Sequence, residues 1–284
     1  MIRIIEVGPR DGLQNEATPI STELKLTFIR GLRDAGLTEI EATSFVSPKW
    51  VPQLGDAEVL WPQLPPGGKY SALIPNARGL QRALELGVDR IAVFTAASDA
   101  FTQKNINMTV AESLAVFADV IQEFRAAIPG GWVRGYVSTA FECPFAGRIA
   151  PSAVVDVSEK LMAMGVDEIS IGDTIGVAAP AEVRALNDAL LPSIPFDRVA
   201  YHFHNTRGTA IANVAQALEM GVRAFDSSAA GLGGCPYAPG ASGNVSTEDL
   251  VYFLERSGFP TGVDLEKLRQ ASQPVLAALA SSPL

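Results

Sequence analysis

The sequence has 284 residues, of which 48% are hydrophobic and 19% are charged, so it can bury a large core and cannot be an extensively disordered chain. The formal net charge of −9 argues against a general nucleic-acid or anionic-membrane binder, which needs a dominant cationic face. With only two cysteines, a disulfide-framed secreted fold is excluded and a reducing compartment is favoured.

Eight short apolar, β-branched runs are predicted to be strands. In chain order they are Ile2–Val7, Glu39–Thr43, Tyr70–Ile74, Arg90–Thr95, Trp132–Thr139, Glu168–Ile171, Val199–His204 and Arg223–Ser227. The chain opens directly on the first run, with neither a secretory leader nor an 18-residue apolar span before it. We therefore expect a cytoplasmic protein with no membrane partner.

Segments with helical periodicity separate these runs. Apolar residues recur at steps of three and four from Thr109 to Ile128, and Thr109 with Glu112 has the spacing of a capping box. Pro180 and Ser246 also stand where helices are expected to begin. The segment from Asp264 to Ala280 is predicted to be one further helix, which packs outside the main fold.

A glycine followed by valine or leucine precedes every second predicted strand, at Gly36, Gly87, Gly165 and Gly221. Glycine just past a helix end adopts the left-handed conformation at low cost. This paired repeat favours a closed (β/α)8 barrel, a TIM barrel, as one catalytic domain over 1–284 with 264–284 as a helical tail. The alternative is an open doubly wound sheet, although 8–12 (GPRDG) is not a dinucleotide-binding motif.

Polar residues cluster where the predicted strands end, which is where (β/α)8 barrels carry their chemistry. They are Arg10, Asp11, Gln14, Glu41, Ser44, Ser170, Asp173, Thr174, His202, His204 and Asn205, followed by a glycine-rich loop over 231–244 that contains Cys235 and Asn244.

His202 and His204 are the only histidines in the chain. Residues i and i+2 of a strand point to the same side, so both imidazoles can meet one ion. Two histidines hydrogen-bonded inside the core are the alternative. Asp11 is the first choice for a completing carboxylate, and Asn244 could add an amide oxygen. This mixed nitrogen and oxygen set suits Mg²⁺, Mn²⁺ or Zn²⁺, and the absence of a required thiolate favours Mg²⁺ or Mn²⁺.

Arg10 beside Asp11 is either a surface ion pair or a fixed cation that stabilises a developing oxyanion. Cys235 lies in a glycine-rich loop, which does not build cores, and could be a nucleophile, a metal ligand or a proton donor. None of the six lysines lies inside a predicted strand, which disfavours a Schiff-base aldolase.

Four motifs resemble those of the 3-hydroxy-3-methylglutaryl-CoA lyase family, and the resemblance extends from about Ile2 to Leu268. The motifs are 6–16 (EVGPRDGLQNE), 43–53 (TSFVSPKWVPQ), 172–176 (GDTIG) and 231–240 (GLGGCPYAPG). The resemblance implies a divalent cation held by Asp11, His202, His204 and Asn244. It also implies catalytic roles for Arg10 and Cys235, and acidic residues linked to activity at Glu41 and Asp173.

The chemistry implied by the resemblance is a retro-Claisen-type cleavage of 3-hydroxy-3-methylglutaryl-CoA to acetoacetate and acetyl-CoA. A cation would lower the pKa of the tertiary hydroxyl, and Asp11, His204 or Asp173 would take its proton. Arg10 would face the thioester enolate oxygen, and Cys235 would protonate the enolate carbon.

Substrate contacts are expected from the strand-end residues Gln14, Ser170 and Thr174, together with Arg10. Lys49, Lys104 and Arg148 could form a local basic rim for the phosphates of CoA, or could simply be solvated surface charges. A homodimer is expected only from the resemblance.

Two residues depart from the family pattern, because Asn205 replaces an aspartate that is common after the second histidine and Arg207 replaces a tyrosine of animal relatives. They leave open a longer or branched 3-hydroxyglutaryl-CoA as substrate. An acyl-CoA synthase running the reverse chemistry, a metal-free thiol hydrolase that uses Cys235 and a non-catalytic CoA-binding barrel are less favoured alternatives.

Overall fold

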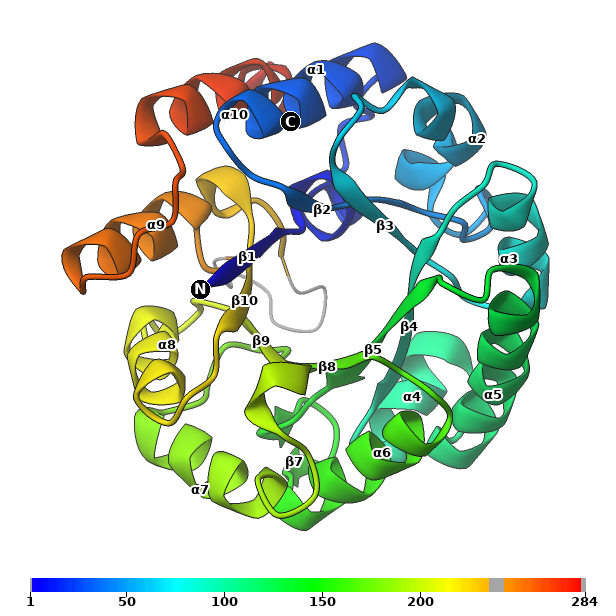
Figure 1. The fold of residues 1–284 in the computed structure, drawn as a ribbon, viewed down its shortest axis with the longest axis vertical. Helices are drawn as coiled ribbons and strands as arrows, with labels where there is room; N and C mark the ends of the chain where they lie inside the picture. Colours follow the sequence, from blue (N-terminus) through cyan, green and yellow to red (C-terminus); the bar gives the residue numbers. More distant parts are fainter. Residues whose placement is uncertain (1, 235–242, 282–284) are drawn as a thin grey trace.

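A closed barrel of parallel strands forms the centre of the computed structural model, which describes residues 2–234 and 243–281 (Figure 1). In barrel order the strands are β1 (Arg3–Glu6), β10 (Ala224–Ser227), β9 (Val199–Phe203), β8 (Glu168–Asp173), β5 (Trp132–Ser138), β4 (Arg90–Ala96), β3 (Lys69–Leu73) and β2 (Glu39–Ser44). All eight predicted strands are confirmed. The pairing of β1 with both β2 and β10 closes the barrel, so the open doubly wound sheet was the wrong alternative.

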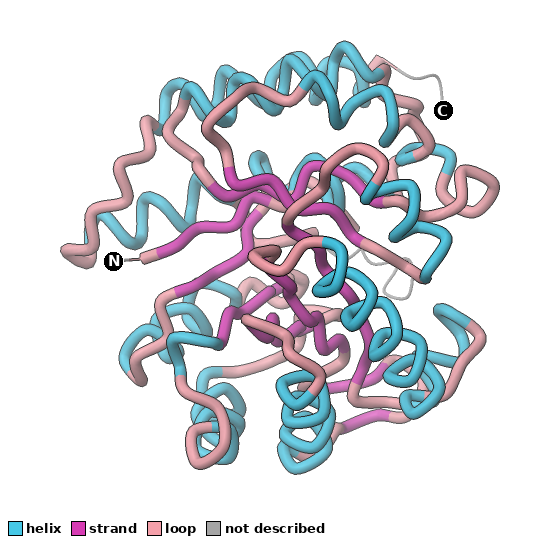
Figure 2. The backbone as a smooth tube through the Cα atoms, turned by 45° about the vertical axis from the view of Figure 1, so that its right-hand side comes forward, coloured by secondary structure: helices cyan, strands magenta, loops and turns pink. Residues whose placement is uncertain are grey.

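Helices surround the strands (Figure 2). They are α1 (Thr22–Asp34), α2 (Ala57–Leu60), α3 (Ala77–Leu84), α4 (Asp99–Ile106), α5 (Val110–Ala127), α6 (Pro151–Ala163), α7 (Pro180–Leu190), α8 (Ala210–Glu219), α9 (Thr247–Arg256) and α10 (Leu265–Ala280). A short antiparallel pair that the sequence did not predict, β6 (Glu142–Cys143) with β7 (Gly147–Arg148), follows β5. Within the described ranges, no helix has both the length and the apolar character needed to cross a bilayer.

The predicted capping box at the start of α5 is confirmed. The Thr109 side chain accepts a hydrogen bond from the Glu112 amide at 3.1 Å, and the Glu112 carboxylate accepts one from the Thr109 amide at 2.7 Å. The face predicted to be apolar packs inward, with Leu114, Phe117 and Phe124 buried. The helix therefore begins and ends within one residue of the predicted range.

The four repeated glycines all have positive φ, between 70° and 108°, and each precedes β2, β4, β8 or β10. At Gly36 an added Cβ would also lie 2.5 Å from the carbonyl oxygen of Gly262, so the backbone passes too closely for a side chain. The paired repeat that favoured a barrel is therefore a repeated helix-to-strand turn.

The C-terminal helix α10 packs against α1 outside the barrel, as predicted (Figure 1). The Asp264 carboxylate accepts the amides of Glu266 and Lys267 and caps its first turn. The main apolar core lies between the strands and the surrounding helices, whereas the barrel interior holds buried charged residues such as Glu41, Arg134 and Asp226. These charges lie directly below the polar strand ends.

Candidate active site

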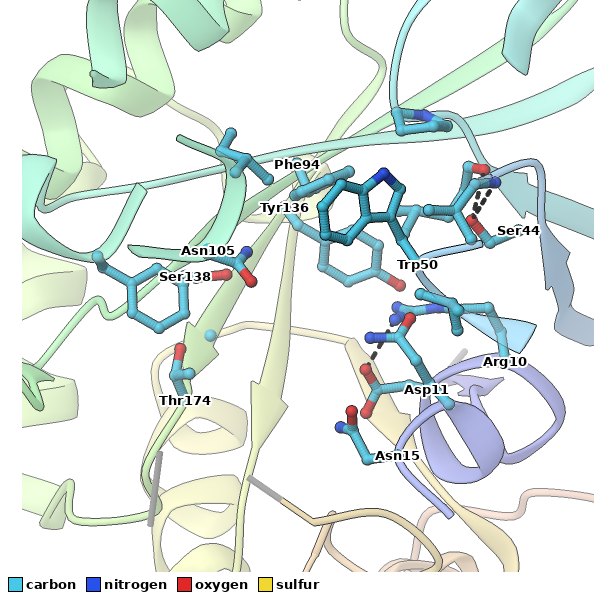
Figure 3. Close-up of a pocket in the computed structure, with 18 of the residues that line it drawn as sticks. Arg10, Asp11, Asn15, Ser44, Trp50, Phe94, Asn105, Tyr136, Ser138 and Thr174 are labelled. Carbon is cyan, nitrogen blue, oxygen red and sulfur yellow. Dashed lines mark hydrogen bonds and ion pairs between the residues drawn. The ribbon is translucent and has the colours of Figure 1, made fainter. Parts of the chain in front are cut away.

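A cavity of about 800 Å³ opens at the carboxyl ends of the barrel strands (Figure 3). It is bordered by the π-helical turn η1 (Gly8–Gly12), the loop after β2, helix α4 and the ends of several strands. Of the predicted site residues, those that line it are Arg10, Asp11, Gln14, Ser44, Lys104, Thr174, His202 and His204. All of these except Lys104 are strand-end residues, so the strand-end argument brought seven of its expected side chains to one cavity.

Asp11, His202 and His204 lie together in this cavity. The Nε2 atoms of the two histidines are 3.2 Å apart, and the Nε2 of His202 is 3.8 Å from the Oδ2 of Asp11. One ligand atom from each residue lies within 4.8 Å of the other two, which is compact enough for a single cation. The i, i+2 spacing at the end of β9 thus has the predicted effect, since both imidazoles face the same point.

Asn244 adjoins this cluster through its amide nitrogen. The Nδ2 donates to the Oδ2 of Asp11 at 2.8 Å and to the carbonyl oxygen of Leu232 at 3.2 Å. A β-bridge between Asn244 and His204 places it there. The amide nitrogen faces Asp11, so coordination through the amide oxygen would require the amide to rotate, and the ligand role of Asn244 stays a prediction.

The electrostatics of the cavity fit a cation. Three carboxylates, those of Asp11, Glu41 and Asp226, share the buried region with two guanidinium groups, those of Arg10 and Arg134. A divalent cation would add positive charge beside the Asp11 carboxylate, and imidazole with carboxylate is a donor set that divalent cations accept.

The protonation of two of the three clustered residues also suits a ligand role. For the third, burial would lower the pKa of His202, but its hydrogen bond to Asp226 and the charge of Asp11 raise it. Burial would raise the pKa of Asp11, but the positive charges of Arg10 and His202 and the hydrogen bond from Asn244 hold that pKa well below its usual range. Burial and the neighbouring His202 lower the pKa of His204 to about 4. Asp11 is therefore a carboxylate and His204 a neutral imidazole near neutral pH, which are the forms that bind metals.

Arg10 is fixed from two sides. Its Nε donates to the fully buried Glu41, and its NH1 donates to the Oδ1 of Asp11 at 2.8 Å. The hydroxyl of Tyr136 donates to the other oxygen of Glu41 at 2.9 Å. Figure 3 shows Arg10 and Asp11 on one side of the cavity, with Thr174 on the other. Glu41 contacts Arg10 but does not line the cavity, so it is placed to hold the Arg10 guanidinium in position.

Sequence reasoning did not single out Asp226, Arg134 or Tyr136. Asp226 lies on β10 and accepts hydrogen bonds from Arg134 at 2.6 Å and from Ser170 at 3.0 Å, and its Oδ2 is 3.1 Å from the Nδ1 of His202. For Arg134 and Asp226 a signal was available, because each is a charged residue inside a predicted strand. Charged residues are rarely buried without a partner, so the two could have been expected to pair.

Other expected side chains lie away from the cavity wall. The Ser170 hydroxyl donates to Asp226 beneath it, and the Asp173 carboxylate accepts the amides of Val177 at 3.1 Å and Ala178 at 3.0 Å. Burial raises the pKa of Asp173 to about 6. Lys49 is exposed beside the cavity without lining it. The roles of these residues stay predictions, and Cys235 lies outside the described residues.

Asn205 and Arg207, the two residues that depart from the family pattern, lie away from the cavity wall. The Asn205 side-chain oxygen accepts the amide of Ala210 at 3.2 Å, at the first turn of α8, where a carboxylate oxygen could do the same. Arg207 is exposed. Arg148, on β7, is exposed and pairs with Glu182 at 3.4 Å.

Known proteins resemble the chain over nearly its whole length. A family model described as HMGL-like matches residues 1–275. The chain is 51% identical over 280 residues to mitochondrial hydroxymethylglutaryl-CoA lyase of Bos taurus, covering 98% of this chain and 86% of the relative. It is 49% identical to the 3-hydroxy-3-methylglutaryl-CoA lyase of Rattus norvegicus that is named cytoplasmic, covering 98% of this chain and 81% of the relative.

Solved structures agree with these relatives. The hydroxymethylglutaryl-CoA lyase of Pseudomonas aeruginosa superposes with a TM-score of 0.95 at 46% identity, covering 99% of this chain and 94% of that one. An HMG-CoA lyase from Acinetobacter baumannii, solved in complex with coenzyme A and 3-methylmalate, gives 0.92 at 39% identity, covering 99% and 92% of the two chains. The chain therefore belongs to the HMGL-like family.

Proposed function

We propose that the protein is a lyase that cleaves 3-hydroxy-3-methylglutaryl-CoA to acetoacetate and acetyl-CoA. The observation that carries this proposal is the cluster of Asp11, His202 and His204 beside a fixed Arg10 on the wall of one cavity. The relatives and structures named as lyases of this substrate support it.

Asp11, His202 and His204 would hold a divalent cation, Mg²⁺ or Mn²⁺. When bound, the cation supplies the positive charge that lets a tertiary hydroxyl lose its proton near neutral pH. Asp11 or His204 would take that proton, because both line the cavity, while Asp173 is turned toward backbone amides.

Cleavage of the carbon–carbon bond moves negative charge onto the thioester oxygen. The Arg10 guanidinium would face that oxygen, and its bonds to Glu41 and Asp11 hold it in place before the charge develops. Cys235 would protonate the enolate carbon to complete acetyl-CoA, a role that rests on the resemblance alone. Lys104, on the cavity wall, would contribute positive charge for an acyl-CoA.

The test is a coupled assay on 3-hydroxy-3-methylglutaryl-CoA, which compares chelator-treated protein with the same protein given Mn²⁺ or Mg²⁺. Formation of acetoacetate and acetyl-CoA only after metal addition is expected. Cleavage that survives the chelator would favour a thiol hydrolase instead. No cleavage despite bound metal, with turnover of a longer or branched acyl-CoA, would change the substrate and keep the reaction class.

We further infer a cytoplasmic homodimer that acts in leucine breakdown. The relative named cytoplasmic supports this location, whereas several relatives are named mitochondrial. Cell fractionation and the mass of the native protein in solution test the location and the dimer.

A further inference from the structure

His202 contacts a second carboxylate on the side of its ring that faces away from the metal cluster. Its Nδ1 lies 3.1 Å from the Oδ2 of Asp226, while its Nε2 faces His204 at 3.2 Å and Asp11 at 3.8 Å. Asp226 is buried on β10 and does not line the cavity. The ring is therefore placed between one carboxylate below and the cluster above.

The neighbours of Asp226 determine where the shared proton lies. Arg134 donates to its Oδ1 at 2.6 Å, and the Ser170 hydroxyl donates to its Oδ2 at 3.0 Å. An ionised carboxylate can only accept hydrogen bonds, and a guanidinium can only donate. The hydrogen atom between Asp226 and His202 therefore belongs to the Nδ1 of the imidazole.

Arg134 is itself held in place. It is fully buried, its Nε lies 3.1 Å from the Oε1 of Glu168, and its NH1 donates to the hydroxyl of Tyr136 at 3.3 Å. Because a buried guanidinium with fixed partners cannot turn away, Asp226 keeps its orientation. His204 lacks such support, since its Nδ1 has no hydrogen-bond partner within the described part of the chain.

We propose that Asp226 is a positioning residue that keeps the proton of His202 on Nδ1 and thereby directs the Nε2 lone pair into the Asp11–His204 cluster. The inference rests on the metal site of the proposed function. Carboxylates that orient metal-ligating histidines typically change metal affinity by about 10- to 100-fold when removed. His202 is thus the histidine of the pair that a buried carboxylate orients, whereas the Nδ1 of His204 has no such partner among the described residues.

The first test is Asp226→Asn, with the dissociation constant of Mn²⁺ measured from the free ion by electron paramagnetic resonance. An asparagine that keeps its oxygen toward Arg134 turns its NH₂ group toward His202 and moves the imidazole proton to Nε2. We expect the Mn²⁺ dissociation constant to rise by about 10- to 100-fold. Asp56→Asn is the matched control, because it makes the same exchange at a carboxylate that pairs with Lys25 at 2.9 Å and lines no part of the cavity, so its Mn²⁺ affinity should be unchanged.

The second test reads the tautomer directly in the metal-free protein. Because the chain has only two histidines, ¹⁵N-histidine labelling gives two ring systems, and a His204→Asn variant assigns them. At about pH 8 we expect His202 to carry its proton on Nδ1 in the wild type and on Nε2 in Asp226→Asn.

A wild-type His202 protonated on Nε2, alone or together with Nδ1, would overturn the proposal, even if the variant failed to fold. So would an Asp226→Asn protein that loses Mn²⁺ affinity with its tautomer unchanged, since Asp226 would then act on the fold alone. The spectrum requires no turnover, so a protein that binds Mn²⁺ but fails to cleave the thioester would contradict the proposed function and leave this inference standing.

Discussion

At the residue scale, the charged groups around the cavity are linked in one chain of hydrogen bonds and ion pairs. Arg134 lies between Asp226 and Tyr136, Tyr136 donates to Glu41, and Glu41 holds Arg10. Each buried charge thus has a partner of opposite sign or a hydrogen-bond donor, as burial demands. The two groups at the cavity surface, His202 and Arg10, are therefore both fixed through the same guanidinium.

Arg10→Met tests the oxyanion role of this arginine. The variant should lower kcat by about 100-fold or more, the effect of losing one oxyanion donor, with a smaller change in KM. The matched control is Arg184→Met, which removes an exposed arginine on α7 and should leave kcat unchanged. A kcat within about threefold of wild type would show that Arg10 does not serve the transition state.

The raised pKa of Asp173 predicts how the stability of the protein changes with pH. Because burial raises its pKa from 3.8 to about 6, the folded protein binds a proton more tightly than the unfolded chain between these values. This group's contribution to stability is present at low pH and is lost as pH rises toward 6. We expect the stability of Asp173→Asn relative to wild type to increase with pH across this window, as measured by urea unfolding at each pH. Parallel curves would contradict the shift.

At the element scale, the helix α10 and its partner α1 show how closely the outer layer packs. A Cβ added to Gly31 of α1 would lie 2.7 Å from the Cβ of Ala271 on α10. No side chain larger than hydrogen fits there without moving one of the two helices. The glycine therefore serves helix packing, although it weakens α1 as an isolated helix.

Gly31→Ala should therefore destabilise the protein by about 1–3 kcal/mol through overpacking, despite the better helix propensity of alanine. Gly130→Ala, at a site where an added Cβ meets no atom within 4 Å, is the matched control and should cost little. Urea unfolding measures both, and kcat should stay the same in each because neither residue lines the cavity. Equal stability of the two variants would refute close packing of α1 on α10.

The elements themselves were largely predictable, because apolar periodicity and the turn glycines recur along the chain. The π-helical turn η1 was not, since the Glu6 carboxylate beside it accepts amides from both Gly8 and Ala229, and Ala229 is distant in sequence. The convergence of Asp11, His202 and His204 could be predicted because strand ends converge in a barrel. The role of Asp226 could not be predicted, because a charge in a strand run marks the residue but does not reveal its contact with His202 on the neighbouring strand.

At the scale of the whole molecule, a bound cation would join segments from both ends of the chain. Asp11 follows β1, while His202 lies on β9 and His204 just after it. Mn²⁺ at 100 times its dissociation constant should raise the free energy of unfolding by about 2.7 kcal/mol, because it binds only the folded state. Thermal unfolding with and without Mn²⁺ measures this, with Asp11→Asn as the variant expected to lose the gain. An unchanged Tm in the wild type would argue against the site.

The closure of the barrel between β1 and β10 also has a consequence for biosynthesis. Asp11 is made early, yet Asn244, which contacts it, is 233 residues further along the chain. A ribosome-bound chain that has emerged only through β8 carries Asp11 and Arg10 but neither histidine. The cluster of Asp11, His202 and His204 can therefore form only after residue 204 has left the ribosome, so any shorter nascent chain lacks the complete site.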